Sequence, residues 1–458
     1  MIHKNISFGV KHIPALDPGF VPIAAFNRAY RELAGKPIAI AIERENGQRV
    51  VYSTYVIGDS SHEAADEFYA ERLVKLLLWA AGGFRVTVFG DDKTAGYIQK
   101  SYSAGGKRAF DCAFMSGVYE HGFEVISRPY EDKTETNETP VQISRSLAGC
   151  RIGFDAGGSD WKVSSVIDGK AVYSEEKVWH PKTTPDPEYH YNEIVSAFKT
   201  AASKMPRVDA IGVSSAGIYI NNRTMVASLF RMVPKEDFER VVKNIYVNAG
   251  KTIGNVPIIV ANDGDVTALA GAMSLNDGQI LGIAMGTSLA AGYVDKNGGI
   301  TGRLSELAFA PVDGKDDGAA DEWSGDKGCG VKYMSQDAVS LLAPKAGVEL
   351  PEGTPAEKLK FVQDLMENGS DASVGIYRSI GCYLGHALAL YREVYDCRHV
   401  LLLGRVMSGK GGNIIMEKAG QVLRDDYPEI QELKLHLPDE KIRRVGQSVA
   451  AAALPKFD

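Results

Sequence analysis

Apolar and polar residues form two kinds of pattern in residues 1–148. Short apolar or alternating runs predict strands, and one longer stretch with apolar residues at helical spacing predicts a helix. The predicted elements are strands at 37–43, 49–57, 84–89 and 122–126 and a helix at 64–81. Asn46-Gly47 predicts a hairpin turn between the first two strands, and the polar residues 130–139 predict a linker or an exposed loop. We therefore expect a small α/β domain over residues 1–148, in which no pattern indicates chemistry.

From Arg151 onward, apolar strands and helices follow one another twice in a similar order. Each series begins with a strand, a glycine turn and a second strand, and it continues with alternating helices and strands. The first series occupies residues 149–278 and the second occupies residues 279–458. This repetition predicts an internal duplication, with two similar half-domains that face each other across a cleft. The Ala-rich helix at 445–453 closes the chain and is expected to return to the first half.

Composition narrows the class of protein. The chain has 458 residues, of which 45% are hydrophobic and 24% are charged, as in soluble globular proteins of two or three domains. A net charge of −7 argues against a nucleic-acid-binding surface. No apolar run is long enough for a membrane span, and the start lacks the apolar core of a signal peptide. The five scattered cysteines indicate reduced thiols in a cytoplasmic protein.

Two glycine-containing hairpin tips, at 155–159 and 286–288, are the first candidate chemistry. Gly157 and Gly158 in one tip and Gly286 in the other expose backbone N–H groups that can hold phosphate oxygens. Ser159, Thr287 and Ser288 add hydroxyls, and Asp155 could position Mg²⁺ through water. The alternative for the first tip is a tight hairpin whose glycines serve the turn alone. If both tips bind phosphate, they would grip a polyphosphate from two sides.

Asp263 is the candidate catalytic base. It follows the apolar strand at 257–261 and Asn262, and it comes directly before a predicted helix. Ligands meet α/β sheets at such strand ends, where a carboxylate could take the proton from an attacking hydroxyl during phosphoryl transfer. The alternative is a residue at a helix N-terminus, stabilised there by the helix dipole. A capping position and a base are compatible.

Four segments resemble, in order, the motifs of the ROK family of sugar kinases and sugar-responsive repressors. They are Asp155-Ala-Gly-Gly-Ser159, Val260-Ala-Asn-Asp263, Gly286-Thr-Ser288 and Ser305-Glu-Leu-Ala-Phe309. The resemblance covers about residues 149–458 and implies an α/β fold: a duplicated ribonuclease-H-like core of the actin/hexokinase-like ATPases, here with an extra N-terminal α/β domain.

The resemblance also implies roles for individual residues. Asp155, Gly157, Gly158 and Ser159 would form the first phosphate site, and Gly286, Thr287 and Ser288 would form the second. Asp263 would deprotonate the sugar hydroxyl, Asn262 and Glu306 would contact other sugar hydroxyls, and the nucleotide-base pocket would begin at Gly404. The implied ligands are ATP, Mg²⁺ and a sugar or polyol, and the implied assembly is a homo-oligomer.

Departures from the family pattern affect the expected metal and substrate. The structural zinc ligands of the family are one His and three Cys, and here their positions hold Phe309, Glu322, Ser324 and Cys329. One thiolate cannot make a tetrahedral site, so no zinc is expected. A family glutamate that contacts the sugar is replaced by Val331, which leaves the sugar preference open. Ser288 and the Gly404-Arg-Val-Met turn depart from the glycine-rich nucleotide segments.

Two functions remain open on the sequence alone. The candidate base favours an ATP-dependent kinase acting on a sugar, whereas the altered nucleotide segments favour a non-catalytic sugar-binding or regulatory protein on the same fold. A DNA-binding repressor is disfavoured because residues 1–148 show strands and no basic helix-turn-helix. Those residues could form a lid, an oligomer interface or a separate activity.

Overall fold

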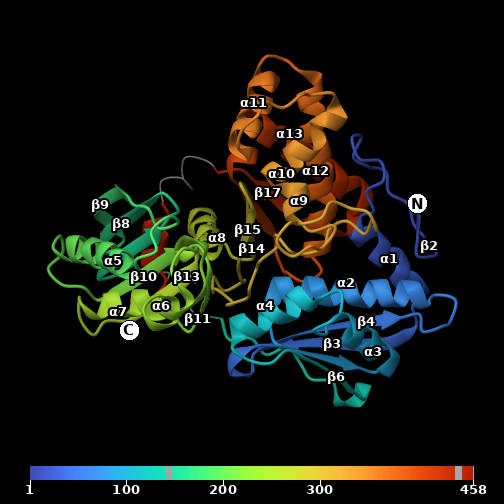
Figure 1. The fold of residues 1–458 in the computed structure, drawn as a ribbon, viewed down its shortest axis with the longest axis horizontal. Coiled ribbons are helices and arrows are strands. Elements are labelled where there is room, and N and C mark those ends of the chain that lie inside the picture. Colours follow the sequence, from blue (N-terminus) through green and yellow to red (C-terminus); the bar gives the residue numbers. More distant parts are fainter. Residues whose placement is uncertain (141–146, 439–445, 457–458) are drawn as a thin grey trace. The chain divides into compact units, whose positions relative to one another are not determined.

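A computed structural model describes residues 1–140, 147–438 and 446–456 of the chain (Figure 1). The chain divides into two compact units, each built from three stretches of sequence. The first unit comprises Met1–Thr139, Ile283–Ala291 and Arg303–Leu437, and the second comprises Pro140–Gly282, Gly292–Gly302 and Pro438–Asp458. Residues 1–139, called the N-terminal region below, therefore share a unit with the later part of the chain.

The N-terminal region is built on a four-stranded sheet in the order β4-β3-β5-β6. β3 (Lys36–Glu43) pairs antiparallel with β4 (Arg49–Val56) and β5 (Arg85–Phe89), and β6 (Glu124–Arg128) runs parallel to β5. The predicted strands and the turn are confirmed, with positive φ angles of 58° at Asn46 and 68° at Gly47. The remaining elements are β1 (Ile2–His3), β2 (Ile6–Ser7), α1 (Ile23–Leu33), α2 (Glu63–Ala81), α3 (Asp92–Ser101) and α4 (Ala109–Tyr119).

Residues 130–139 form an exposed segment whose backbone is hydrogen-bonded to the neighbouring sheet. Most of them are exposed, as predicted for a loop, but the backbone of Asn137 pairs with Arg49 through two hydrogen bonds of 2.8 and 2.9 Å. This segment therefore lies along the edge strand β4, where it covers backbone groups that would otherwise be open to another chain.

The later part of the chain forms a second sheet and a helical layer, which belong to the first unit except for residues 280–282 and 292–294 of the sheet. Its strands are ordered β15-β14-β16-β17, and β16 and β17 are parallel. They comprise β14 (Ile280–Met285), β15 (Leu289–Val294), β16 (His399–Leu403) and β17 (Lys434–His436). The helices are α9 (Val331–Met334), α10 (Gln336–Leu342), α11 (Pro355–Glu367), α12 (Asp371–Tyr391) and α13 (Gly409–Asp426). Gly381 and Gly385 let α12 and α13 approach closely, because a Cβ at Gly381 would lie 2.7 Å from the carbonyl oxygen of Ile415.

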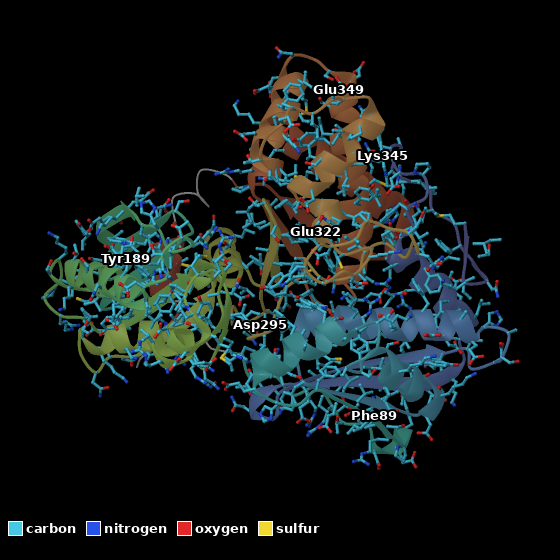
Figure 2. All side chains as sticks on the ribbon, viewed as in Figure 1. Phe89, Tyr189, Asp295, Glu322, Lys345 and Glu349 are labelled. Carbon is cyan, nitrogen blue, oxygen red and sulfur yellow. The ribbon has the colours of Figure 1, made fainter. Side chains whose placement is uncertain are left out.

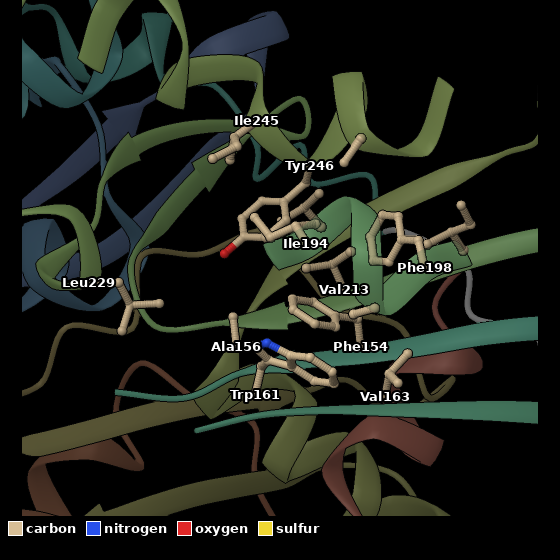
Figure 3. Close-up of a cluster of buried hydrophobic side chains, with 14 of the residues drawn as sticks. Phe154, Ala156, Trp161, Val163, Ile194, Phe198, Val213, Leu229, Ile245 and Tyr246 are labelled. Carbon is tan, nitrogen blue, oxygen red and sulfur yellow. The ribbon is translucent and has the colours of Figure 1, made fainter. Parts of the chain in front are cut away.

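The second unit has a five-stranded sheet in the order β13-β10-β7-β8-β9. The strands are β7 (Cys150–Ala156), β8 (Asp160–Ile167), β9 (Lys170–Val178), β10 (Ala210–Ser215) and β13 (Ile258–Asn262), with a separate hairpin of β11 (Ile218–Ile220) and β12 (Arg223–Val226). On one face, Phe154 and Val213 pack against Phe198 of α5 (Pro187–Ala202) and Tyr246 of α7 (Ile245–Lys251) (Figure 3). A short helix, α6 (Lys235–Arg240), precedes α7.

The other face of this sheet carries α15 (Gln447–Ala452) and α8 (Asp263–Leu275). Side chains alternate along a strand, so Gly153 and Gly212 face away from the Phe154 core. A Cβ at either glycine would lie 1.7 Å from a carbonyl oxygen of α15, that of Ser448 or of Ala451. The closing helix thus packs on the backbone of β7 and β10, at positions where only glycine leaves room for it.

The five-stranded sheet and the sheet that contains β14 share one strand order. The order β8-β7-β10-β13 corresponds, in order of appearance along the chain, to the order β15-β14-β16-β17. The duplicated α/β fold predicted from the sequence is therefore confirmed. Within the described parts of the chain, every helix is too short or too polar to cross a bilayer.

Candidate functional site

The carboxyl ends of β7, β10 and β13 bring two acidic residues to one edge of the second unit. The three strands are parallel and in register, so Asp155 pairs with Ser214 and Ser215 pairs with Asn262. Asp263 follows directly as the first residue of α8. Two strand spacings of about 4.8 Å each separate β7 from β13. The two carboxylates therefore belong to the same sheet edge, where α/β proteins bind ligands.

Asp155 is a partly buried carboxylate held by a neighbouring strand. The Ser214 hydroxyl donates a hydrogen bond of 2.7 Å to Asp155 Oδ1. Burial raises the pKa of Asp155 to about 6, the Ser214 hydrogen bond opposes that rise, and the charge of Asp263 adds to it. A carboxyl with this pKa exchanges its proton near neutral pH, which is typical of functional positions.

Asp263 is fixed by the start of α8. Asn262 is the N-cap, and its side chain accepts a hydrogen bond from Gly264 N and donates one to Gly217 O, both at 2.7 Å. Asp263 Oδ1 accepts from the same Gly264 N–H at 3.0 Å, and burial raises the pKa of Asp263. The helix-terminal role expected for Asp263 is confirmed, while its role as a base stays a prediction.

Trp179 anchors the turn of the first glycine tip, at Gly157 and Ser159. Its indole N–H donates to Gly157 O at 2.8 Å, and its backbone N–H donates to Ser159 O at 3.1 Å. A Cβ at Gly158 would lie only 2.6 Å from Lys182 Nζ. The ammonium group of Lys182 thus lies against the candidate phosphate loop. This cation could not be predicted from the sequence, because nothing in the spacing of residues 181–187 marks it.

The second glycine tip and Gly404 lie side by side in the first unit. Gly286 N donates to Ser288 O, and Gly286 O accepts from Gln336 N, both at 2.9 Å. Gly404 follows β16, the neighbour of β14, and has a φ of 95°. A Cβ at Gly404 would lie 2.3 Å from Met285 O. The structure therefore places the start of the predicted nucleotide-base pocket next to the predicted second phosphate loop.

Glu306 lies at the carboxyl end of α2, in the same unit as Gly286 and Gly404. Its N–H donates to Trp79 O at 2.9 Å, and the N–H groups of Leu304 and Ser305 donate to the next two carbonyls of α2. The candidate sugar contact is thus attached to the N-terminal region, an arrangement that the local sequence around Glu306 did not indicate.

The four positions that correspond to the family's zinc ligands do not fit a zinc ion. Phe309 packs against Trp79 with a ring-centroid distance of 4.4 Å, and exposed Glu322 (Figure 2) pairs with Lys332. Ser324 donates to Asp321, and Cys329 is the single thiol among the four positions, too few for a tetrahedral zinc site. Elsewhere in residues 1–140, 147–438 and 446–456, no group of three or more His, Cys, Asp or Glu side chains could hold a metal ion.

The sequence matches the ROK family over residues 151–436, which is more than half of the chain. The chain belongs to the ROK family. Among solved structures, it is similar to a ROK hexokinase from Thermus thermophilus, with 16% identity over 67% of this chain and 97% of that one and a TM-score of 0.52. It is also similar to a ROK family transcriptional regulator described as a homologue of the E. coli MLC protein, with 18% identity over 70% and 80% of the two chains and a TM-score of 0.53. A search of curated proteins found no match.

These similarities show the fold, which is that of the actin/hexokinase-like ATPases, and they agree with the duplicated sheet topology. At such identities the similarity extends to the fold alone. A hexokinase and a transcriptional regulator both stand among the ROK structures that resemble this chain. The choice between catalysis and regulation therefore depends on the residues of the site.

Proposed function

We propose that this ROK protein is an ATP-dependent kinase that transfers a phosphoryl group to a hydroxyl of a sugar or sugar-like polyol. The observation that carries the proposal is the position of Asp263, a partly buried carboxylate between the end of β13 and the start of α8. The strand that precedes it, β13, ends at the same sheet edge as β7, the strand of Asp155. A protein that only senses a sugar would have no need of a base at this position.

In the proposed reaction, Asp263 takes the proton of the acceptor hydroxyl as the new phosphorus–oxygen bond forms and the bond to ADP breaks. Its raised pKa makes it a stronger base than an exposed aspartate. The Asn262 cap and the Gly264 N–H restrict its motion, since both act on the first turn of α8. Asn262 and Glu306 are proposed to contact other hydroxyls of the sugar.

The nucleotide phosphates are assigned to the two glycine tips. Backbone N–H groups of Gly157, Gly158 and Ser159 and of residues 286–288 would donate to phosphate oxygens. The ammonium of Lys182 would add positive charge at the first tip. A Mg²⁺ ion bound with the nucleotide would neutralise part of the phosphate charge. The Asp155 carboxylate would accept hydrogen bonds from water molecules on this ion, because Mg²⁺ binds few carboxylates directly and keeps several waters.

A sugar panel tests this proposal. Purified protein is assayed for ADP release with hexoses, N-acetylhexosamines and polyols, and Asp263→Asn is compared with wild type. Loss of the base is expected to lower kcat by about 10²–10⁴-fold while the KM for the sugar changes little. Asp265→Asn is the matched control, because an asparagine there still accepts the hydrogen bond from Tyr293 N, and its activity should stay near that of wild type.

One observation favours the second candidate, a sugar-binding regulator. Directly after Gly404, Val406 and Met407 form a buried 3-10 turn where the nucleotide pocket would begin, and these side chains replace the glycines of the family pattern. If wild type and Asp263→Asn are equally inert with every sugar while a sugar still binds, the kinase proposal is refuted and the regulator is favoured.

A further inference from the structure

Residues 303–330, called the long loop below, carry Glu306 and contain no helix or strand, although the structure describes all of them. Residues 304–305, 307–314 and 328–330 within it are nevertheless buried. A buried irregular segment of this length needs partners for its backbone and for its charged groups. Much of the backbone of the long loop bonds within the loop, and further partners, including those of Glu306 and Asp326, come from the N-terminal region.

The first attachment is at the carboxyl end of α2. A helix leaves its last carbonyls without partners inside the helix. The N–H groups of Leu304, Ser305 and Glu306 donate to Ala81 O, Ala80 O and Trp79 O at 3.1, 3.0 and 2.9 Å. Just before them, Arg303 forms a two-point ion pair with Glu138 at 2.9 and 2.6 Å. Glu306 is thus fixed by the backbone on which it stands.

The second attachment is the carboxylate of Asp326, of which only 12% is exposed. It contacts three cations of the N-terminal region: Lys75 at 3.0 Å, Arg72 at 3.5 Å, and Arg108. Lys75 is fully buried and also pairs with Asp111 at 3.0 Å. Removing one partner of such a group leaves a buried charge without compensation, which disrupts the structure strongly.

The third attachment is an aromatic cluster at the position of the missing zinc ligand. Phe309 and Trp323 of the long loop meet aromatic rings of α2 and α4, with centroid distances between 4.4 and 6.4 Å. The rings on the helices are Trp79, Phe110 and Phe114. Apolar packing therefore occupies the place where the family resemblance implies a metal-bound histidine.

We propose that contacts with the N-terminal region, called the clamp below, fix the long loop in place of a structural metal ion. In the clamp, the cations of the N-terminal region bind Asp326, and the clamp as a whole positions Glu306 for the sugar. The role of Glu306 rests on the proposed function, whereas the clamp rests on the contacts above. Asp326 is a positioning residue, since it acts on the sugar only through the loop.

Hydrogen exchange and kinetics of Asp326→Asn test the proposal. Peptides from the long loop are expected to exchange at least about tenfold faster in Asp326→Asn than in wild type, because the loop loses the buried charge that binds it to Lys75, Arg72 and Arg108. The KM for the sugar should rise about tenfold, while the KM for ATP stays within about twofold, since no predicted phosphate contact lies on the loop. Asp316→Asn is the control. Asp316 lies in the same loop and forms an exposed ion pair with Lys4, and its substitution should change neither the exchange of the loop nor the KM for the sugar.

Wild-type protein supplies an independent arm if Asp326→Asn does not fold. Metal analysis is expected to find well under one zinc per chain, and 1,10-phenanthroline is expected to leave exchange in the long loop unchanged. Stoichiometric zinc, or a loop that the chelator deprotects, would overturn the clamp, as would unchanged exchange in Asp326→Asn. If exchange responds as expected but no sugar is phosphorylated, the clamp stands and the kinase proposal fails.

Discussion

Replacing Asp155 by asparagine is expected to stabilise the protein at alkaline pH while it removes phosphoryl transfer. The carboxylate lies at the end of β7, partly buried, and accepts a hydrogen bond from Ser214. Asparagine has nearly the same shape and keeps an oxygen that can accept that bond. The substitution therefore removes the charge and leaves the contacts, so its effect on stability reports the cost of placing a carboxylate at this position.

The magnitude follows from the pKa. In the folded chain, the pKa of Asp155 is raised from 3.8 to about 6, chiefly by burial. A shift of this size corresponds to about 3 kcal/mol between the two protonation states. Because the side chain is only partly buried and water screens it, we expect Asp155→Asn to raise the free energy of unfolding by about 1–2 kcal/mol.

The sign of the pH dependence is fixed by the direction of the shift. The folded protein binds the Asp155 proton more tightly than the unfolded chain does, so that group favours the folded state below pH 3.8. This contribution is lost as the pH rises through about 6, where the folded-state carboxyl ionises. The advantage of Asp155→Asn should therefore be largest near pH 8 and small near pH 4.

Urea unfolding at several pH values measures this effect, with fluorescence of the buried Trp161 and Trp179 as the probe for the second unit. Asp160→Asn is the control on the same hairpin, because Asp160 is 33% exposed and lies 3.5 Å from Lys162. We expect that control to gain nothing. An Asp155→Asn gain that is absent at pH 8, or equal at all pH values, would refute the reasoning. In the kinase assay, activity should fall at least about 100-fold.

Two further substitutions test the glycine tips. Lys182→Met should raise the KM for ATP about five- to tenfold with a smaller effect on kcat, because Nζ lies against Gly158; initial rates at two ionic strengths measure this, and an unchanged KM would exclude Lys182 from the nucleotide site. Gly404→Ala should lower the free energy of unfolding by about 2–4 kcal/mol and weaken nucleotide binding, since the new Cβ meets Met285 O at a φ of 95°. Gly375→Ala, a helical position with room for a methyl group, is the control, and equal thermal unfolding of the two variants would contradict this expectation.

Much of the fold was predictable because its signals are local. The strand runs that end at Asp155 and Ala261, and the glycine tips at 155–159 and 286–288, are short patterns that need no knowledge of distant residues. The structure confirms these strands and the duplicated topology. Even the shared edge of Asp155 and Asp263 follows from one rule, that parallel strands present their carboxyl ends together.

The attachments of the long loop were not predictable in this way. Lys75 and Asp326 form an ion pair across 251 positions of sequence, and neither residue stands in a pattern that marks the other. Lys182 reaches Gly158 through a loop whose path no periodicity determines. Both contacts depend on the tertiary structure, which a single sequence specifies without displaying.

One signal of the clamp was nevertheless present in α2. The helix is buried on nearly every side, and its buried residues include Glu71 and Lys75. Charged side chains are almost never fully buried unless they are paired, so charges within so apolar a helix indicate that charged partners cover it. Those partners include Asp326, from the loop that carries Glu306. A lid, an oligomer interface and a separate activity were all open for the N-terminal region. The contacts favour a fourth role, as part of the structure that holds the candidate sugar-binding residue.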